Sequence, residues 1–397
     1  FDALYEKYER NKKIPRKTIN AQKLFMELLR ERAETGRIYI MNIDHCNTHS
    51  SFKDKVYMSN LCQEITLPTK PVQHIDDEEG EIALCILSAI NLGLIKDKEE
   101  LEELCDLSVR ALDEIIDYQE YPVAAAKKST EARRSLGIGY IGLAHYLAKN
   151  KVKYNNKEAW KLVDEVTEAF QYFLLKASNQ LAIEKGKCDY FERTKYADGI
   201  LPIDTYKKDV DNLVKRKLSY DWTNLRKTIK EHGLRHSTLS AQMPSESSSV
   251  VSNATNGIEP PRDYLSVKKS KKGTLKQIVP DYNRLKNFYT LLWDMPDNEG
   301  YINIVAIMQK YFDQAISGNW SYNPENYEGN EVPLSVMAKD LLNTYKLGWK
   351  TSYYQNTYDG KTDIDEPTHS VGWHDNIKEE PKEITSDDQE ECEACAI

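Results

Sequence analysis

Residues 57–66 read Y-M-S-N-L-C-Q-E-I-T, and this stretch decides how the rest of the chain is interpreted. If it is extended, Asn60, Cys62 and Glu64 share one face, because side chains alternate between the two faces of a strand. An amide, a thiol and a carboxylate that are buried together need partners or a ligand to offset their desolvation. The alternative for this string alone is a structural strand with one incidental buried cysteine.

The composition bounds the class of protein. The 397 residues are enough for a large core or for two to three domains. The sequence has no apolar run of transmembrane length and no secretory signal, so we expect a cytoplasmic protein without membrane contact. Seven unevenly spaced cysteines do not form a disulfide framework in that compartment, so metal, redox and catalytic roles compete with simple burial.

The acidic charge is concentrated at the end of the chain. Residues 361–397 hold 12 acidic residues and 3 lysines, which accounts for the whole net charge of −9. The remaining body is formally neutral, which argues against a nucleic-acid-binding surface. The tail is expected to be a separate, solvated segment.

Hydrophobic periodicity outlines the body. Helical spacing predicts helices over residues 18–34, 98–118, 143–149, 157–185, 283–294, 301–316 and 333–345. Gly36 supplies a stop for the first helix. Residues 37–43 are expected to form a strand, followed by a polar turn at residues 44–49. Residues 81–92, with Cys85 in their middle, are nearly continuously apolar, which fits a strand covered on both faces or a buried helix.

Two further motifs are interpreted as structural. Residues 137–142 match the G-x-G-x-x-G dinucleotide fingerprint, but the polar residues 127–134 stand where that motif needs a strand. The motif is therefore interpreted as a tight turn leading into the helix at residues 143–149. His45, Cys46 and His49 could be drawn as a metal site, but no second ligand pair follows at a suitable spacing, so no metal is predicted.

A serine-rich segment follows Pro244. Residues 245–249 read S-E-S-S-S and precede an apolar Val250-Val251 pair. Such a segment opening a helix offers backbone N–H groups, hydroxyl donors and the positive end of the helix dipole, which suit a phosphate or diphosphate. The alternative is an ordinary N-cap with spare serines. The segment lacks the Gly-rich loop and lysine of a Walker motif, which argues against a nucleoside triphosphatase.

The end of the chain carries two redox candidates. Tyr353 and Tyr354 are adjacent, and on a strand they would point to opposite faces, so a stacked redox pair would be a special arrangement. Cys392 and Cys395 form a single C-x-x-C, which favours a dithiol shuttle over a zinc ribbon, because a ribbon needs two such pairs. A flexible tail of roughly 35 residues reaches about 30–35 Å, enough to visit a site on the body.

Together these motifs resemble the C-terminal half of the large, catalytic subunit of class I ribonucleotide reductase. The segments that carry the resemblance follow in chain order, and they are residues 35–39, 45–49, 59–64, 82–93, 243–262, 278–282, 352–357 and the terminal cysteine pair. The resemblance implies an α/β fold, the second half of the ten-stranded ribonucleotide reductase barrel with surrounding helices, over residues 1–355. Residues 356–397 would be a flexible acidic redox tail.

The resemblance also implies a reaction. Cys62 would form a thiyl radical that takes the 3′-hydrogen of a ribonucleoside diphosphate. Glu64 would be the base on the 3′-hydroxyl, and Asn60 would hold the 2′ and 3′ oxygens. Cys85 would be one of the two thiols that reduce the 2′ position. A radical site and a base must converge on one sugar, which agrees with their shared face.

Further expectations follow from the same resemblance. Tyr353 and Tyr354 would pass the radical from a separate small subunit, which would hold a diferric-tyrosyl radical, so no cofactor is expected in this chain. Cys392 and Cys395 would re-reduce the active site and would themselves be reduced by thioredoxin or glutaredoxin. The diphosphate of the substrate would bind at residues that lie together in the serine-rich segment: Ser245, Glu246, Ser247 and Ser248.

The N-terminal half of such a subunit would supply the second active-site thiol and bind most nucleotide effectors. We therefore expect the chain to be a separate or truncated polypeptide that needs an N-terminal fragment for turnover. One alternative is a non-catalytic half that binds the small subunit or that fragment, and another is a thiol–disulfide carrier that uses only the tail. The presence of all the site residues favours the enzyme.

Overall fold

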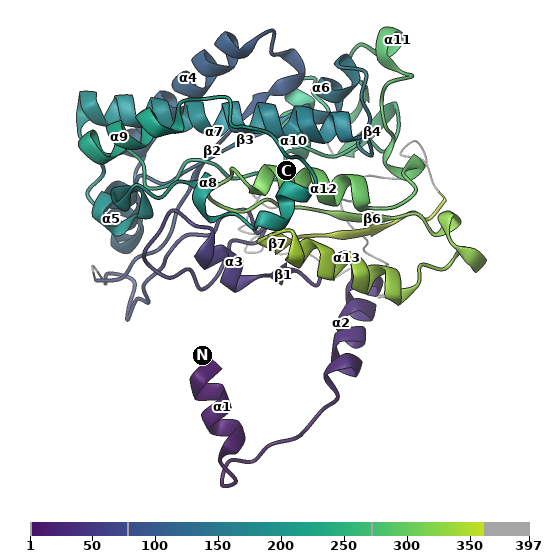
Figure 1. The fold of residues 1–397 in the computed structure, drawn as a ribbon, viewed down its shortest axis with the longest axis horizontal. Coiled ribbons are helices and arrows are strands. Elements are labelled where there is room, and N and C mark those ends of the chain that lie inside the picture. The colour runs from purple at the N-terminus through teal and green to yellow at the C-terminus, as the bar shows by residue number, and fades with distance from the viewer. Residues whose placement is uncertain (1, 78, 271–272, 361–397) are drawn as a thin grey trace, which may run out of the picture.

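The structure is a computed structural model that describes residues 2–77, 79–270 and 273–360 (Figure 1). Its α-helices are α1 (Asp2–Arg10), α2 (Ala21–Thr35), α3 (Ile43–Thr48), α4 (Lys98–Tyr118), α5 (Ala124–Arg133), α6 (Leu143–Lys149), α7 (Lys157–Lys185), α8 (Pro202–Thr205), α9 (Trp222–His232), α10 (Glu246–Val251), α11 (Tyr282–Leu285), α12 (Glu299–Gln309) and α13 (Leu334–Lys346). Its strands are β1 (Ile40–Met41), β2 (Ile86–Asn91), β3 (Leu136–Ile141), β4 (Leu265–Ser270), β5 (Gly273–Ile278), β6 (Trp320–Tyr322), β7 (Thr351–Ser352) and β8 (Gln355–Thr357).

Parallel pairing organises the centre of the molecule. β2 pairs in parallel with β3, and backbone hydrogen bonds continue from β3 to residues 238–242 and from there to residues 314–317. β6, which follows directly, pairs in parallel with β8, while β7 pairs antiparallel with β1. Helices lie between successive parallel segments along the chain, because a parallel connection needs a crossover. The order of the pairing is therefore β2, β3, 238–242, 314–322 and 355–357.

The main core lies between this array and the long helices. α7 packs against α4, α9 and α12, and Figure 1 shows α4, α7 and α9 together along one side. The ring of Tyr140 on β3 packs edge-on against Phe170 of α7 and Phe312, with centroids 5.3 and 5.8 Å apart. Burying these aromatic rings holds β3 against α7. α1, in contrast, lies apart from the body in Figure 1, joined to it by residues 11–20.

Most long helices confirm the sequence predictions. α4, α6 and α7 have the predicted bounds, and α13 agrees within one residue at each end. α2 ends where predicted, with Gly36 at a φ of 70° and its N–H donating to Arg32 O. No helix in the described ranges is both long enough and apolar enough to cross a membrane.

Two helix predictions near the C-terminal end are wrong. Residues 283–294 form only the short α11 and a 3-10 turn at Leu292–Asp294. The helix predicted over residues 301–316 ends at Gln309. Beyond it, Asp313 accepts the backbone N–H groups of Leu239 and Ser240, and this tertiary bonding draws residues 313–317 into the parallel array.

The strands were predicted less well than the helices. The strand expected over residues 37–43 shrinks to β1, and the expected polar turn at residues 44–49 is mostly helix α3. β2 begins only at Ile86, so Cys85 lies just before the strand rather than in its middle. In each case tertiary pairing, rather than local apolar patterning, sets where the strand begins.

The G-x-G-x-x-G motif is a strand, not the turn that was predicted. β3 covers its first five residues and is buried at every position, and Gly142 then caps α6. A Cβ at Gly137 would lie 2.9 Å from Cys85 Sγ, and one at Gly139 would lie 2.7 Å from Ala241 O. The glycines therefore allow neighbouring strands and the Cys85 thiol to approach closely.

Candidate active site

Asn60, Cys62 and Glu64 lie on a tight turn, so the prediction of an extended strand is wrong. Gln63 N–H donates to Asn60 O at 3.2 Å, and Asn60 N–H donates to Ile65 O at 3.3 Å. Gln63 has a φ of 68°, a left-handed conformation that no strand contains. The turn nevertheless joins two of the predicted residues, since Asn60 Nδ2 donates to Glu64 Oε1 at 2.9 Å.

The carboxyl group of Glu64 is enclosed. The residue is only 2% exposed, and its Oε2 accepts a hydrogen bond from Ser317 Oγ at 3.2 Å. Burial raises the pKa of the Glu64 carboxyl, and the hydrogen bonds from Asn60 and Ser317 partly oppose that shift. A carboxylate with a raised pKa is a suitable proton acceptor near neutral pH.

Cys62 is in contact with the tyrosine pair. Tyr353 Oη donates to Cys62 Sγ at 3.5 Å. The rings of Tyr353 and Tyr354 lie with centroids 3.9 Å apart and planes at 43°. The two residues stand between β7 and β8, so the alternation of a continuous strand does not separate them. Burial, followed by the hydrogen bonds of Tyr354 and Cys62, raises the pKa of Tyr353.

Tyr39 is a third aromatic residue at the site, and no role was predicted for it from the sequence. Its ring centroid lies 4.8 Å from that of Tyr353 and 5.4 Å from that of Tyr354. Burial, followed by a hydrogen bond with Tyr354, raises the pKa of Tyr39. Tyr39 precedes β1, and only the pairing of β1 with β7 brings it beside the tyrosines.

Cys85 is linked to the turn through one side chain. Gln314 Nε2 lies 3.6 Å from Cys85 Sγ, and Gln314 Oε1 accepts the Thr66 N–H at 3.3 Å. Burial raises the pKa of the Cys85 thiol, and the negative charge of Glu64 adds to that shift. Gln314 therefore joins the segment that follows Glu64 to the second predicted redox cysteine.

The serine-rich segment opens a short helix, as predicted. Ser245 is the N-cap of α10, and its Oγ donates to Met243 O at 3.1 Å, while Ser248 Oγ donates to Ser245 O at 3.3 Å. Glu246 and Ser248 are exposed, and Ser247 is partly exposed. The segment follows the carboxyl end of residues 238–242, and parallel sheets bind ligands at that edge.

Comparison with known proteins assigns the chain to a family. The family model described as "Ribonucleotide reductase, barrel domain" matches residues 1–355. The chain belongs to this family. Its α/β fold is therefore the ribonucleotide reductase barrel, to which the parallel array described above contributes.

Relatives with high identity agree with this assignment. The ribonucleoside-diphosphate reductase subunit alpha of Haemophilus influenzae is 60% identical over 369 residues, which cover 92% of this chain and 49% of that protein. The subunit alpha of Buchnera aphidicola subsp. Schizaphis graminum is 57% identical, with 96% and 50% covered. Subunit alpha of ribonucleoside-diphosphate reductase 1 of Escherichia coli is 56% identical, with 91% and 48% covered. The chain thus spans about half the length of these relatives, as expected for the C-terminal half of a class I large subunit.

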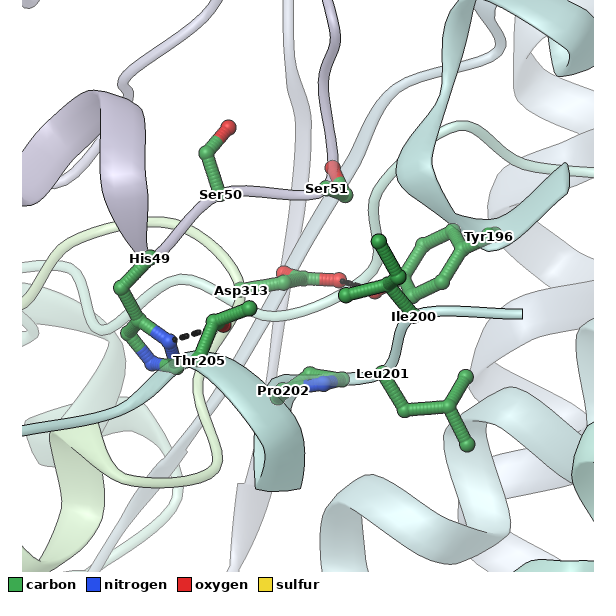
Figure 2. A pocket seen from close by; sticks show the side chains of 9 residues that line it. All are labelled: His49, Ser50, Ser51, Tyr196, Ile200, Leu201, Pro202, Thr205 and Asp313. Carbon is green, nitrogen blue, oxygen red and sulfur yellow. Dashed lines mark hydrogen bonds between the residues drawn. The ribbon is translucent and has the colours of Figure 1, made fainter. Parts of the chain in front are cut away.

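A small pocket in this ribonucleotide reductase barrel domain lies beside α3 rather than at the turn (Figure 2). Its cavity volume is about 10 Å³, far below that of typical ligand pockets of roughly 300–1,000 Å³. His49 bonds Thr205 Oγ1 at 2.8 Å and Gln309 O at 2.6 Å, and Asp313 accepts from Tyr196 Oη at 2.8 Å. Because its volume is small and the side chains of His49, Thr205, Tyr196 and Asp313 are engaged in these bonds, the pocket is structural.

His45, Cys46 and His49 each have separate partners in this barrel domain. His45 Nδ1 bonds Trp349 O at 2.8 Å, Cys46 Sγ bonds Lys350 O, and His49 points into the pocket described above. Cys46, Cys105 and Cys188 are buried, at 0%, 0% and 2% exposed. Cys392 and Cys395 lie outside the described residues.

Proposed function

We propose that the chain reduces ribonucleoside diphosphates to deoxyribonucleoside diphosphates for DNA synthesis, as part of a class I catalytic subunit. The single observation that carries this proposal is the 3.5 Å contact between Tyr353 Oη and Cys62 Sγ. It joins a pair of closely packed tyrosines, whose ring planes are tilted by 43°, to a thiol that shares its turn with an amide and a buried carboxyl. The names of the relatives support the same activity, and because the chain covers about half of each, we expect turnover to need the rest of such a subunit.

Tyr354 and Tyr353 would carry the radical to Cys62. The phenoxyl radical of Tyr353 takes the hydrogen atom of the Cys62 thiol, which restores the phenol and leaves a thiyl radical. In the preceding step the radical passes from Tyr354 to Tyr353, whose ring centroids lie 3.9 Å apart. The source would be a diferric-tyrosyl radical in the separate small subunit, so this chain would need no cofactor of its own.

The chemistry at the ribose uses the groups on the turn. The Cys62 thiyl radical takes the hydrogen atom from C3′, and Glu64 takes the proton of the 3′-hydroxyl. Asn60 holds the 2′ and 3′ oxygens beside the carboxylate that it already contacts. Placing both groups on one turn fixes their approach to a single sugar.

Reduction of the 2′ position uses two thiols. The 2′-hydroxyl leaves as water with a thiol proton, and Cys85 and a thiol from the rest of the subunit supply two electrons as they form a disulfide. Glu64 then returns its proton to the 3′ oxygen, and Cys62 returns its hydrogen atom to C3′. The balance is one ribonucleotide and one dithiol consumed, and one deoxyribonucleotide, one water and one disulfide formed.

Other parts of the chain would serve this reaction. The diphosphate would bind at the opening of α10, through Ser245, Glu246, Ser247 and Ser248. Residues 1–355 would form the barrel portion and residues 356–397 the redox tail, whose Cys392 and Cys395 would reduce the active-site disulfide. Thioredoxin or glutaredoxin would reduce the tail, and the N-terminal part of the subunit would bind most nucleotide effectors. The reaction would be cytoplasmic, without nucleic-acid or membrane contact.

The test is dithiol-dependent CDP reduction with the small subunit present. It compares the chain alone, the chain with an N-terminal fragment, and the same mixture carrying Cys62→Ser. The matched control is Cys105→Ser, which changes a buried cysteine of α4. We expect turnover only in the mixture, lost with Cys62→Ser and kept with Cys105→Ser. Turnover that survives Cys62→Ser contradicts the proposal, and an inactive mixture favours a non-catalytic binding half.

A further inference from the structure

Residues 313–321, for which no catalytic or binding role was predicted from the sequence, run beside the catalytic turn. Ala315 N–H donates to Glu64 O at 3.0 Å. Two residues further on, Ser317 Oγ donates to Glu64 Oε2 at 3.2 Å and also contacts the carbonyl oxygen of Cys62. This segment therefore holds both the backbone and the carboxyl group of Glu64, together with the backbone of Cys62.

The same segment also holds the backbone of the tyrosine pair. Gly318 O accepts the Tyr353 N–H at 2.9 Å, and Asn319 Oδ1 accepts the Tyr354 N–H at 3.1 Å. Trp320 N–H then donates to Tyr354 O at 2.8 Å. One continuous stretch thus sets the position of the turn relative to the tyrosines, and within it the Ser317 side chain bonds both the backbone of Cys62 and the carboxyl group of Glu64.

The Ser317 hydroxyl faces two acceptors with one hydrogen. Ser317 is only 6% exposed, so water does not readily supply a second donor. A hydroxyl donates to one acceptor at full strength, and its oxygen can accept from another group. The carbonyl of Cys62 and the carboxyl of Glu64 therefore compete for the same hydrogen.

We propose that Ser317 is a positioning residue that couples the protonation of Glu64 to the backbone position of Cys62. The inference rests on the proposed function of these two residues. When Glu64 is ionised, its charge attracts the Ser317 hydrogen, since hydrogen bonds to charged acceptors are the stronger ones. When Glu64 has taken the substrate proton, its acid O–H donates to Ser317 Oγ, and Ser317 turns its hydrogen to the Cys62 carbonyl. Ser317 keeps its proton throughout.

This exchange has a consequence for the order of events. Glu64 is protonated while the substrate radical exists, and in that interval Cys62 must hold the hydrogen atom that it later returns. The Cys62 carbonyl is then bound most firmly. Ser317 would thus hold Cys62 in position while the substrate radical exists. Displacement of Cys62 in that interval would prevent it from returning the hydrogen atom, and the radical would be lost.

Other ionisable groups near Glu64 must be separated from this effect. The Cys85 thiol senses the charge of Glu64, and Asp313 acts on Cys85 from the same segment. Lys350 Nζ donates to the carbonyls of Asp313 and Gln314 at 2.9 and 2.8 Å, and burial lowers the pKa of Lys350 to about 7. A control on the same segment retains all three groups, so it shows any shift that they cause.

The test compares Ser317→Ala, Ser317→Thr and the control Ser321→Ala. Ser321 lies on β6, where its hydroxyl accepts from Asn356 Nδ2 at 3.5 Å, away from the turn. The first readout is the infrared titration of the Glu64 carboxyl in this chain, assigned with Glu64→Gln. The second is the pH profile of CDP reduction in the reconstituted mixture, and thermal melting checks folding.

We expect Ser317→Ala to move the Glu64 titration upward by about 0.5–1 pH unit, because a donor to the carboxylate is lost. The acidic limb of kcat/KM should move with it, and turnover should fall about 10-fold. Ser317→Thr, which retains the hydroxyl, should restore both, and Ser321→Ala should change neither. An unchanged titration in a folded Ser317→Ala variant overturns the inference, as does a shift that the threonine variant does not reverse. An inactive wild-type mixture with a shifted titration instead counts against the proposed function alone.

Discussion

At the scale of single residues, removal of the phenol oxygen of Tyr353 distinguishes a role in radical transfer from a role in packing. Tyr353→Phe keeps the ring beside Tyr354 and Tyr39 but removes the atom that contacts Cys62 Sγ. Because phenylalanine cannot form a phenoxyl radical, we expect CDP reduction in the reconstituted mixture to fall at least about 1,000-fold, a loss of about 4 kcal/mol in transition-state stabilisation. Circular dichroism should show an unchanged fold.

The control for this variant is Tyr322→Phe on β6. Tyr322 Oη donates to Asp340 at 3.0 Å and contacts none of the proposed redox residues by that bond. Its loss should cost about 1 kcal/mol of stability while turnover persists. Equal turnover by Tyr353→Phe and wild type would remove Tyr353 from the radical path.

Glu259 gives a second prediction at the residue scale, on the pH dependence of stability. Burial raises the pKa of the Glu259 carboxyl to about 7, and a hydrogen bond from Asn319 opposes the shift. The folded state then binds more protons than the unfolded state between about pH 4.5 and 7, so stability falls as pH rises through that window. We expect the free energy of unfolding to fall between pH 5 and 7.5 by on the order of 2 kcal/mol less in Glu259→Gln than in wild type.

Urea unfolding at pH 5 and pH 7.5 measures that difference. Glu328→Gln, at an exposed carboxyl, is the matched control and should leave the dependence unchanged. An equal fall in stability for Glu259→Gln and wild type would show that Glu259 is ionised in the folded protein at both pH values.

At the scale of elements, the sequence predicted what local periodicity controls. α4 and α7 are long amphipathic or buried helices, and their apolar spacing sets their bounds. The turn at residues 60–65 was missed because an alternating polar string is compatible with a strand, and only the positive φ of Gln63 excludes one. β3 was missed because its glycines resembled a loop, although they serve close packing.

The close packing of β3 gives a prediction at this scale. Gly137→Ala would place a Cβ 2.5 Å from Leu87 Cδ2 and 2.9 Å from Cys85 Sγ. Overpacking of this kind typically costs about 1–3 kcal/mol, and here it also displaces Cys85. We expect a lower free energy of unfolding in urea and faster alkylation of Cys85.

Gly186→Ala is the control for crowding. Its Cβ meets no atom within 4 Å, so only the strain of a φ of 91° acts there. If Gly137→Ala is as stable as wild type and its Cys85 reacts at the same rate, β3 and Cys85 do not pack as closely as described.

At the scale of the whole molecule, parallel pairing assembles a site from distant segments. Cys62, Ser317 and Tyr353 come from three parts of the chain that meet only through the pairing around residues 314–322. The resemblance to a family supplied Cys62 and Tyr353, because their motifs are distinctive. Ser317 and Gln314 lie in strings with no chemical signature, and residues 35–39 contributed to the resemblance without assigning a role to Tyr39. The proximity of these three residues to the site could therefore be seen only in the folded chain.

A buried ionic cluster ties several elements of the molecule together. Asp113 of α4 is 0% exposed and bonds Arg134, Arg235, His236 and, at 3.4 Å, Lys185 of α7. Asp113→Asn leaves Arg134, Arg235 and Lys185 without their anionic partner, which typically costs about 3–5 kcal/mol. Urea unfolding should show this loss.

The control is Asp106→Asn, which removes a half-exposed partner of Arg110 on the same helix. Surface pairs of this kind contribute about 0–1 kcal/mol, so the urea unfolding midpoint of Asp106→Asn should stay close to that of wild type. Similar midpoints for Asp113→Asn and Asp106→Asn would show that the cluster does not join the elements energetically.

The most direct test of the central claim follows the 3′-hydrogen of the substrate. The reconstituted mixture reduces an equimolar mixture of CDP and 3′-deuterated CDP, and mass spectrometry measures the isotope ratio of the remaining substrate. If the Cys62 thiyl radical takes the 3′-hydrogen, the remaining CDP should become enriched in deuterium, and Cys62→Ser should abolish the reaction. Reduction without enrichment that also survives Cys62→Ser would contradict the account.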